Sequence, residues 1–440
     1  MTLIKKPVIL SLLLMGFSAI VSAQSNEWKV LNNEVISLYQ QGQYDKATMV
    51  ARRAVVAAEK DFGANHPNVA TSLNNLAELY RTQAQYRHAE PLYERSLAIR
   101  ERTLNPNHPD VAISLNNLAG LYDLQGQYAR AEPLHRRALT IREKILGPHH
   151  PDVAESLNNL AGLYRSQGKY AQAEPLFKRS LAIWESALGP DHLNVAESLN
   201  NLAALYRSQG KYAQAEPLFK RSLAIWESAL GPDHPSVAES LNNLGRLYDA
   251  QGQYAQAEPL FRRALTIRER TFGSNHPDVA SSLNNLAVLY RNQAQYAQAE
   301  QLYKRSLAIL EKVLSPNHPD VATSLNNLAE LYTNQDQYVQ AEQLYKRSLE
   351  ISEKVLGPNH PDVTRNLNNL AVLYRKQGKH AQAESLYKRS LEIWEEAHGS
   401  NHPNVAASLN NLAVLYRETN QLSKAEELEK RAASIQAPRQ

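Results

Sequence analysis

The side chains of this sequence that could do chemistry recur at a fixed interval. Histidine appears every 42 residues, at positions 66, 108, 150, 192, 234, 276, 318, 360 and 402. Because imidazole is a common metal ligand, this series raises the question of a zinc site. However, ligands of one ion lie about 2 Å from it, whereas equivalent residues of successive repeats lie about one helix spacing, roughly 10 Å, apart. We therefore expect no metal and no other cofactor, and interpret these histidines as helix-capping or packing groups.

A pair of adjacent asparagines recurs with the same interval, at 74–75, 116–117, 158–159, 200–201, 242–243, 284–285, 326–327, 368–369 and 410–411. Asparagine is a poor helix former because its amide competes with the backbone, so eighteen of them cost on the order of 10 kcal/mol relative to alanine. Some interaction must offset that cost. Two explanations are open: the amides hydrogen-bond between adjacent helices, or they present donors and acceptors to a ligand.

Catalytic signatures are missing from the sequence. It contains no phosphate-binding glycine loop, no H-E-x-x-H and no G-x-S-x-G. Catalysis usually needs differentiated positions, whereas residues 153–192 and 195–234 differ only by Gly162 against Ala204. We predict that the protein is not an enzyme.

Each 42-residue unit is expected to form two helices. Apolar residues follow a helical spacing, as at Val321, Leu325, Leu328 and Tyr332, and a proline such as Pro67 suits the first turn of a helix. In the first full unit, the helices should cover about 67–83 and 86–104. Repetition at this period indicates an all-α solenoid, in which each unit buries its apolar face against its neighbours.

The predicted organisation is a signal peptide at 1–23, a capping helix pair at 24–65, eight units at 66–401, a capping unit at 402–436 and a tail at 437–440. Glu429 takes the place of the aromatic residue found at Tyr93 and Phe177, which fits an end that no further unit covers.

The first residues, "MTLIKKPVILSLLLMGFSAIVSAQ", carry two lysines, a short apolar run and a small-residue cleavage site. This pattern predicts export to the periplasm or the extracellular space, with the mature chain starting at Gln24. The apolar run is shorter than the roughly 18 residues that a membrane span needs, so we expect no membrane anchor after cleavage. The formal charge of +4 falls to +2 when Lys5 and Lys6 are removed with the leader, and the sequence contains no cysteine. A charge so near balance, with no aromatic platform beside the arginines, argues against nucleic-acid binding.

The spaced small and large residues Leu76, Ala77, Tyr80, Ala89, Tyr93 and Ser96 match a tetratricopeptide repeat. The 42-residue unit, with "HPDVA", "LNNLA", "GKY" and "RSL" in order, resembles the repeat domain of kinesin light chains and their bacterial relatives. The resemblance covers about residues 27–436 and implies a right-handed α-solenoid of about ten antiparallel helix pairs. A motor-adaptor role fits poorly, because only a few residues precede the first helix where kinesin light chains have a long coiled coil.

The resemblance also implies a concave peptide-binding groove lined by the first helix of each pair. The groove residues it suggests are the second asparagines Asn75, Asn117, Asn159, Asn201, Asn243, Asn285, Asn327, Asn369 and Asn411. They also include the arginines after the helix tyrosine, namely Arg81, Arg165, Arg207, Arg291, Arg375 and Arg417. A guanidinium group matches a carboxylate, so the arginines favour an acidic protein or peptide segment. Glu155, Glu197 and Glu239 make the expected surface mixed.

The sequence therefore predicts a non-enzymatic scaffold that binds an extended or helical segment of a protein partner in this groove. The alternative is a structural or assembly spacer of the cell envelope, which would act through its convex face or its ends. The partner, its orientation and the oligomeric state cannot be derived from the sequence.

Overall fold

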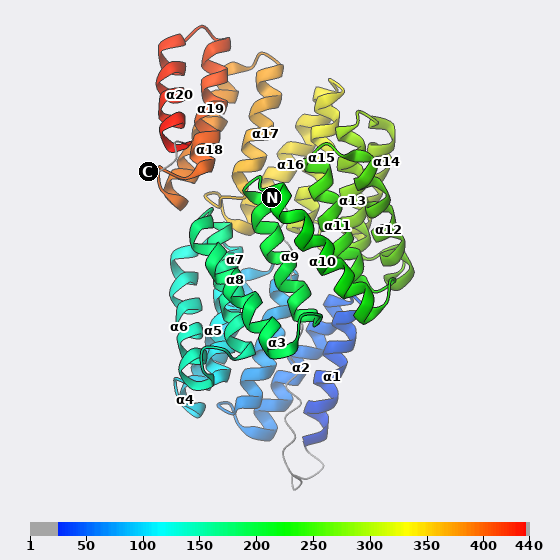
Figure 1. Ribbon diagram of the computed structural model, residues 1–440, viewed down its shortest axis with the longest axis vertical. Helices are drawn as coiled ribbons and strands as arrows, with labels where there is room; N and C mark the ends of the chain where they lie inside the picture. Colours follow the sequence, from blue (N-terminus) through cyan, green and yellow to red (C-terminus); the bar gives the residue numbers. More distant parts are fainter. Residues whose placement is uncertain (1–24, 437–440) are drawn as a thin grey trace. The chain divides into compact units, whose positions relative to one another are not determined.

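The computed structural model describes residues 25–436, and all regular structure in that range is helical. Twenty helices follow one another as ten antiparallel pairs (Figure 1). The first helices of the pairs are α1 (Ser25–Gln40), α3 (Pro67–Thr82), α5 (Pro109–Leu124), α7 (Pro151–Ser166), α9 (Leu193–Ser208), α11 (Pro235–Ala250), α13 (Pro277–Asn292), α15 (Pro319–Asn334), α17 (Val363–Lys376) and α19 (Pro403–Glu418). The second helices are α2 (Tyr44–Phe62), α4 (Tyr86–Leu104), α6 (Tyr128–Leu146), α8 (Tyr170–Leu188), α10 (Tyr212–Leu230), α12 (Tyr254–Phe272), α14 (Tyr296–Val313), α16 (Tyr338–Leu356), α18 (His380–His398) and α20 (Leu422–Gln436). The predicted all-α fold of about ten helix pairs is confirmed.

The predicted signal peptide at 1–23 and the tail at 437–440 lie outside the described residues. Within residues 25–436, no helix combines the length and the apolar character that crossing a bilayer requires.

The repeating histidine is a helix cap. In all nine positions, its Nδ1 atom accepts a hydrogen bond from the backbone N–H two residues later, at 3.0–3.2 Å. The first backbone N–H groups of a helix have no partner inside the helix, so a side-chain acceptor at this place stabilises the helix start. The capping interpretation of these histidines is confirmed.

Helix pairs are joined by small and apolar side chains. Between α9 and α10, Val195, Ala196 and Leu199 form a buried cluster with Ile225. The Ser222 hydroxyl donates to the backbone carbonyl of Ala196 at 2.7 Å, so that α10 also binds the backbone of α9. Each even-numbered helix of this region also packs on the next odd-numbered one, as α8 does on α9, and successive odd-numbered helices such as α9 and α11 are in contact. Every unit therefore buries its apolar residues against its neighbours.

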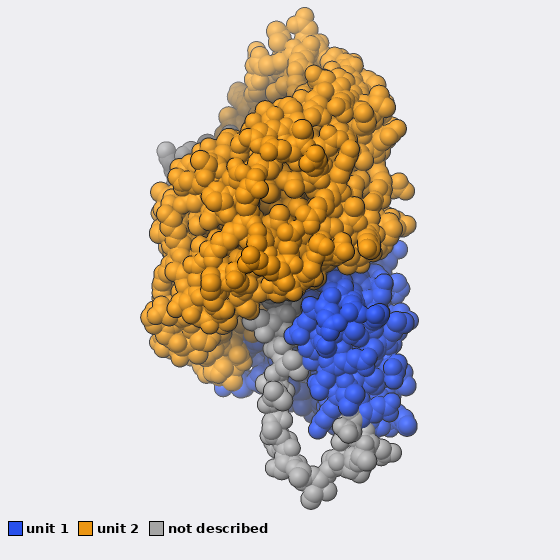
Figure 2. Space-filling model, turned by 90° about the vertical axis from the view of Figure 1, so that its right-hand side faces the viewer, with its two compact units in different colours: residues 1–122, 133–145 blue, residues 123–132, 146–440 orange. Residues whose placement is uncertain are grey.

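The chain divides into two compact units (Figure 2). The first contains residues up to 122 and residues 133–145, and the second contains residues 123–132 and those from 146 onward. In the first unit, the indole of Trp28 donates to Ser72 Oγ at 2.7 Å, which fastens the opening pair α1–α2 to α3. In the second unit, Glu429 of α20, the last helix of the described range, forms an ion pair with Arg417 at 2.6 Å.

An arginine that recurs at the same position of the even-numbered helices forms ion pairs with glutamates. Arg221 of α10 pairs with Glu185 of α8 at 2.7 Å, and Arg263 of α12 pairs with Glu227 of α10 at 2.5 Å. The partner glutamate lies 36 residues earlier in both cases. These arginines are thus engaged in ion pairs between neighbouring helix pairs.

Candidate functional site

The asparagine pairs form a ladder of hydrogen bonds between units. The side-chain N–H of a second asparagine donates to the side-chain oxygen of the first asparagine in the preceding unit. The bonds are Asn75 to Asn32 (3.2 Å), Asn117 to Asn74 (2.8 Å), Asn201 to Asn158 (3.1 Å), Asn243 to Asn200 (3.0 Å), Asn327 to Asn284 (2.9 Å) and Asn369 to Asn326 (3.1 Å). A net contribution of about 1 kcal/mol for each bond offsets much of the helix propensity that each asparagine pair loses.

The ladder is the first of the two explanations that the sequence left open. Asn201 and Asn243 are buried, at 7% and 5% exposure. The other predicted groove asparagines are half-buried, namely Asn75, Asn117, Asn159, Asn285, Asn327, Asn369 and Asn411. That these amides also contact a ligand stays a prediction.

Four of the six predicted groove arginines have an acidic partner within the protein. Arg81 pairs with Glu78, and Arg291 pairs with Glu330 of the next odd-numbered helix. Arg375 pairs with Glu418, and Arg417 pairs with Glu429. A guanidinium group that is already paired has less to offer a ligand.

Arg165 and Arg207 differ from these four because neither forms an ion pair with an acidic side chain among the described residues. An Nη1 atom of each is shielded from solvent and has no hydrogen-bond partner among the described residues. Both side chains remain half-buried as a whole, so part of each guanidinium group faces solvent. A shielded N–H without an acceptor is costly unless a ligand or water supplies one. These two arginines lie on the neighbouring helices α7 and α9, which are in contact.

A third arginine, Arg246 on α11, extends this group. It lies 39 residues after Arg207, and Glu330 lies 39 residues after Arg291. Arg246 therefore occupies the position from which Glu330 neutralises Arg291, but it brings a second positive charge instead of a carboxylate. We call Arg165, Arg207 and Arg246 the arginine cluster.

The three charges of the arginine cluster act on one another. Burial, followed by the charges of Arg246 and Arg165, lowers the pKa of Arg207 to about 9. Burial also lowers the pKa of Arg246, which Asp249 partly restores and Arg165 lowers further. Burial lowers the pKa of Arg165 too, against the opposing effect of Asp123. Arginine keeps its charge at neutral pH, and Asp123 and Asp249 offset only part of the three positive charges, so the cluster is a region of excess positive charge.

An acidic row lies at the other end of the same helices. Glu197 is ten residues before Arg207, about 15 Å along the axis of α9. Glu239 of α11 is half-buried, and burial, reinforced by Asp278 and Glu197 and opposed by Arg268, raises its pKa to about 7. The odd-numbered helices of this region are thus acidic near their starts and basic near their ends, in line with the mixed surface predicted from sequence.

Sequence reasoning placed Arg165 and Arg207 among six equal arginines and did not group Arg246, at a variable groove position, with them. The signal for Arg246 was available, because its position holds Glu78 and Glu330 in other units. The sequence alone did not show that the residue at this position lies close to the arginine of the preceding repeat, as Glu330 does to Arg291.

A known repeat family matches the chain along almost its whole length. The tetratricopeptide repeat model fits overlapping segments at 29–102, 89–144, 125–186, 152–228, 200–270, 250–312, 278–354, 320–392 and 362–437. The chain belongs to the tetratricopeptide repeat family. No curated protein matches this tetratricopeptide repeat protein.

Solved structures refine the assignment. A kinesin light chain of Podosopora anserina with nearly identical TPR-like repeats is 31% identical; the match covers 47% of this chain and 97% of that one, with a TM-score of 0.41. BtubC (BKLC) from P. vanneervenii is 27% identical, with 57% of this chain and 94% of that chain covered and a TM-score of 0.42. The identity across nearly all of the Podosopora protein places the chain among the kinesin light chain-like repeat proteins, as the sequence predicted.

A third structure agrees in fold alone. The Rap protein, solved in complex with Competence and Sporulation Factor, is 14% identical, with a TM-score of 0.52 and coverage of 94% of this chain and 98% of that one. It supports the tetratricopeptide repeat architecture over 94% of this chain.

Proposed function

We propose that this tetratricopeptide repeat protein is a non-enzymatic scaffold that binds an acidic segment of a protein partner at the arginine cluster. Tetratricopeptide repeat proteins are typically protein–protein interaction scaffolds. The proposal adds where the partner binds and what chemistry it carries: carboxylates of an extended or helical segment that crosses α7, α9 and α11.

One observation carries this proposal. The chain neutralises the equivalent arginines with glutamates, as Glu330 does for Arg291. Among residues 25–436, Arg165 and Arg207 form no such ion pair, and Arg246 adds a third positive charge beside them. Carboxylates from a partner would supply the missing acceptors and separate three like charges. Charge-assisted hydrogen bonds to a guanidinium group contribute about 1.5–3 kcal/mol each when they form away from bulk water.

The test uses a fluorescein-labelled decaglutamate peptide as a defined acidic probe, with the mature chain and fluorescence anisotropy at two salt concentrations. The triple variant Arg165→Gln, Arg207→Gln, Arg246→Gln should weaken binding at least tenfold, which corresponds to about 1.4 kcal/mol. A control triple variant with the same charge change, Arg221→Gln, Arg263→Gln, Arg305→Gln, alters only arginines that already have ion pairs on the even-numbered helices. Equal weakening by both triple variants, or no effect of the first, would show that the arginine cluster is not the binding site.

The asparagine ladder favours one second candidate, a structural spacer of the cell envelope. Hydrogen bonds that run from unit to unit stiffen the array whether or not a ligand is bound. A spacer would act through its outer face or its ends, so partner contacts would then survive substitution of the arginine cluster.

Export to the periplasm or the extracellular space is part of the proposal. It is supported by the sequence of residues 1–23, which reads as a cleavable leader, and by the lack of cysteine, which leaves the fold indifferent to an oxidising compartment.

A further inference from the structure

His360 and His402 each make a second contact, with a backbone carbonyl far along the chain. The Nε2 atom of His360 lies 3.2 Å from the backbone carbonyl oxygen of Leu124, and that of His402 lies 2.8 Å from the carbonyl oxygen of Gln167. These pairs are 236 and 235 residues apart in sequence, and all four residues belong to the second compact unit. Two equivalent contacts, one repeat apart, join the same two regions of that unit.

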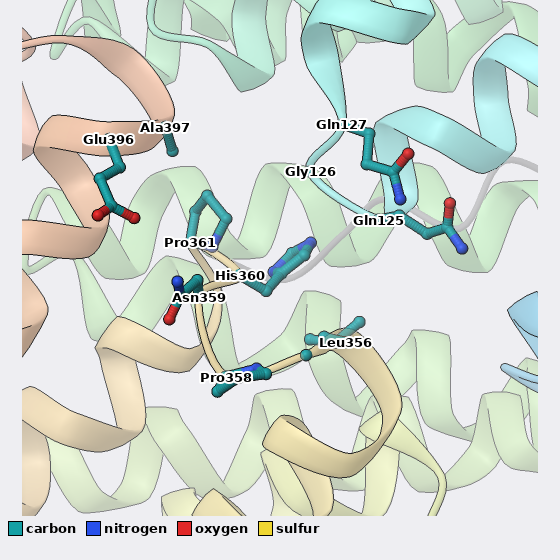
Figure 3. Close-up of a pocket in the computed structure, with 11 residues that line it drawn as sticks. Gln125, Gly126, Gln127, Leu356, Pro358, Asn359, His360, Pro361, Glu396 and Ala397 are labelled. Carbon is teal, nitrogen blue, oxygen red and sulfur yellow. The ribbon is translucent and has the colours of Figure 1, made fainter.

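Each turn that contacts one of the two histidines has a glycine where a larger residue would collide with the imidazole ring. Gly126 and Gly168 both have a positive φ, +67° and +68°, and a Cβ atom at Gly168 would lie only 2.5 Å from Nε2 of His402. At Gly126, a Cβ atom would lie 2.9 Å from Nε2 of His360. Figure 3 shows the ring of His360 directed at the segment that contains Gln125 and Gly126, in a cavity that Glu396 of α18 also lines. His360 and His402 are 5% and 9% exposed, whereas the capping ring of His192 is exposed.

One protonation state serves both contacts of each ring. Nδ1 must carry a lone pair, because it accepts the backbone N–H of Asp362 or Asn404, at 3.0 and 3.1 Å. Nε2 must then carry the single proton of the neutral ring, which it donates to the carbonyl of Leu124 or Gln167. A second proton would go onto Nδ1, where it would face a backbone N–H at the positive end of a helix. The protonated ring therefore has to leave the cap, and its movement takes Nε2 away from the carbonyl.

We propose that His360 and His402 form a proton-sensitive latch, which holds the turns at Leu124 and Gln167 while both rings are neutral and releases them on acidification. The latch is independent of the proposed binding function, because it uses neither the arginine cluster nor a partner. Burial is the main cause that lowers the pKa of both rings, so both rings are neutral at neutral pH and the latch holds the two turns.

The groups around the latch act in both directions, and burial has the largest effect. Asp362, beside His360, favours the protonated ring, and so do the hydrogen bonds to the two carbonyls. Against them stands burial. A third ring, His398, packs beside the latch, with its centroid 4.5 Å from that of His402 and 5.1 Å from that of Tyr128. Burial, with the charges of His402, Lys169 and His360, lowers the pKa of His398 to about 4. The remaining charged groups here are Asp123 on the turn side, which together with Asp362 acts on Tyr128, and Glu396 in the cavity.

The test measures the distance across the latch. The sequence has no cysteine, so Gln172→Cys and Ser400→Cys, both at exposed positions, place two spin labels on either side of the His402 contact. Double electron–electron resonance should give a short, narrow distance distribution at pH 7.5 and a longer, broader one at pH 5. For a reference pair at Gln172→Cys and Gln214→Cys, in adjacent 42-residue repeats, the distance distribution should be the same at both pH values.

Variants separate the latch from the cap. His360→Asn with His402→Asn keeps a good N-cap acceptor but removes the Nε2 donor, so the long distance should appear already at pH 7.5. His192→Asn with His234→Asn makes the same cap substitution at rings for which the structure shows the cap but no carbonyl contact, and should leave the distance and its pH response intact. The latch is ruled out if the distance is independent of pH, if the pH response persists in the His360→Asn, His402→Asn variant, or if the control variant opens as well.

A glycine pair provides a second test that does not alter any histidine. Gly168→Ala and Gly210→Ala introduce the same side chain at nearly the same positive φ, +68° and +70°, but only the first meets His402; a Cβ at Gly210 meets nothing within 4 Å. Gly168→Ala should lengthen the distance at pH 7.5 and Gly210→Ala should not. Equal distances in both variants would contradict the latch.

Discussion

The asparagine ladder makes a quantitative prediction about stability. In Asn243→Ala, the side-chain Oδ1 atom of Asn200 loses its donor, which lies 3.0 Å away. Asn200 is buried, at 8% exposure. A buried acceptor without a partner costs about 1–3 kcal/mol. The substitution also gains about 0.6 kcal/mol of helix propensity, so we expect a net loss of roughly 0.5–2.5 kcal/mol.

The double variant Asn200→Ala, Asn243→Ala removes donor and acceptor together. It leaves no orphaned amide and gains about 1.2 kcal/mol of helix propensity, so its stability should be close to that of the unmodified chain. The double-mutant cycle should therefore show a coupling energy of about 1 kcal/mol or more between the two residues. Asn285→Ala is the matched control, because no ladder bond from its amide is described, and it should be neutral or slightly stabilising.

Urea unfolding followed by circular dichroism is the assay. The transitions should be fitted with a model of coupled repeats, because units of a solenoid unfold partly independently. Hydrogen exchange of the backbone amides in α9 and α11 would locate the effect. If Asn243→Ala proves as stable as the unmodified chain and the two substitutions are simply additive, the ladder does not offset the helix cost of the asparagines.

Three further predictions follow from other parts of the chain. Ala294 has φ of +58° in a turn where Gly126 and Gly168 stand in other repeats. Ala294→Gly should therefore raise the free energy of unfolding by about 1 kcal/mol, which is measured as a higher urea midpoint. Because the pKa of His398 falls from 6.5 to about 4 on folding, mainly through burial, the unfolded chain binds a proton first as pH decreases, and stability is lost between about pH 6.5 and pH 4. The shift corresponds to about 3 kcal/mol at most, and to about 1–2 kcal/mol after solvent screening of the partly exposed ring; His398→Phe should lessen the loss when urea midpoints at pH 7.5 and 4.5 are compared. Finally, mass spectrometry of the exported protein should find a chain that begins at Gln24, whereas an intact Met1 would contradict cleavage.

Much of the fold could be predicted from the sequence because each unit repeats the same local instructions. The 42-residue period, the helical spacing of Val321, Leu325 and Leu328, and the histidine–proline start each indicate the same two helices. The capping role of the histidines also followed from their position beside a helix start. A fold can be predicted from sequence when the repeat period, the apolar spacing and the helix-start residues all indicate the same structure.

The sequence could not reveal which repeated residues differ in role. His192 and His360 stand at the same position of their units, yet only His360 meets a carbonyl 236 residues away, because that contact depends on where the chain returns. Likewise, Arg207 and Arg291 follow the same tyrosine, and whether each is neutralised depends on the residue 39 positions later, Arg246 or Glu330. Such differences arise from packing between units, which a single repeat does not encode.

Site-specific photo-crosslinking in the native host tests the proposed binding site most directly. A photoreactive residue at Gly162 on α7, where an added Cβ atom meets nothing within 4 Å, lies about one helical turn before Arg165. The same residue at the exposed Gln172 on α8 samples an even-numbered helix. We expect a partner to crosslink from position 162 and not from 172, and the crosslink to disappear with Arg165→Gln, Arg207→Gln, Arg246→Gln. A partner captured only from position 172, or captured from 162 regardless of the arginine cluster, would contradict the proposed site.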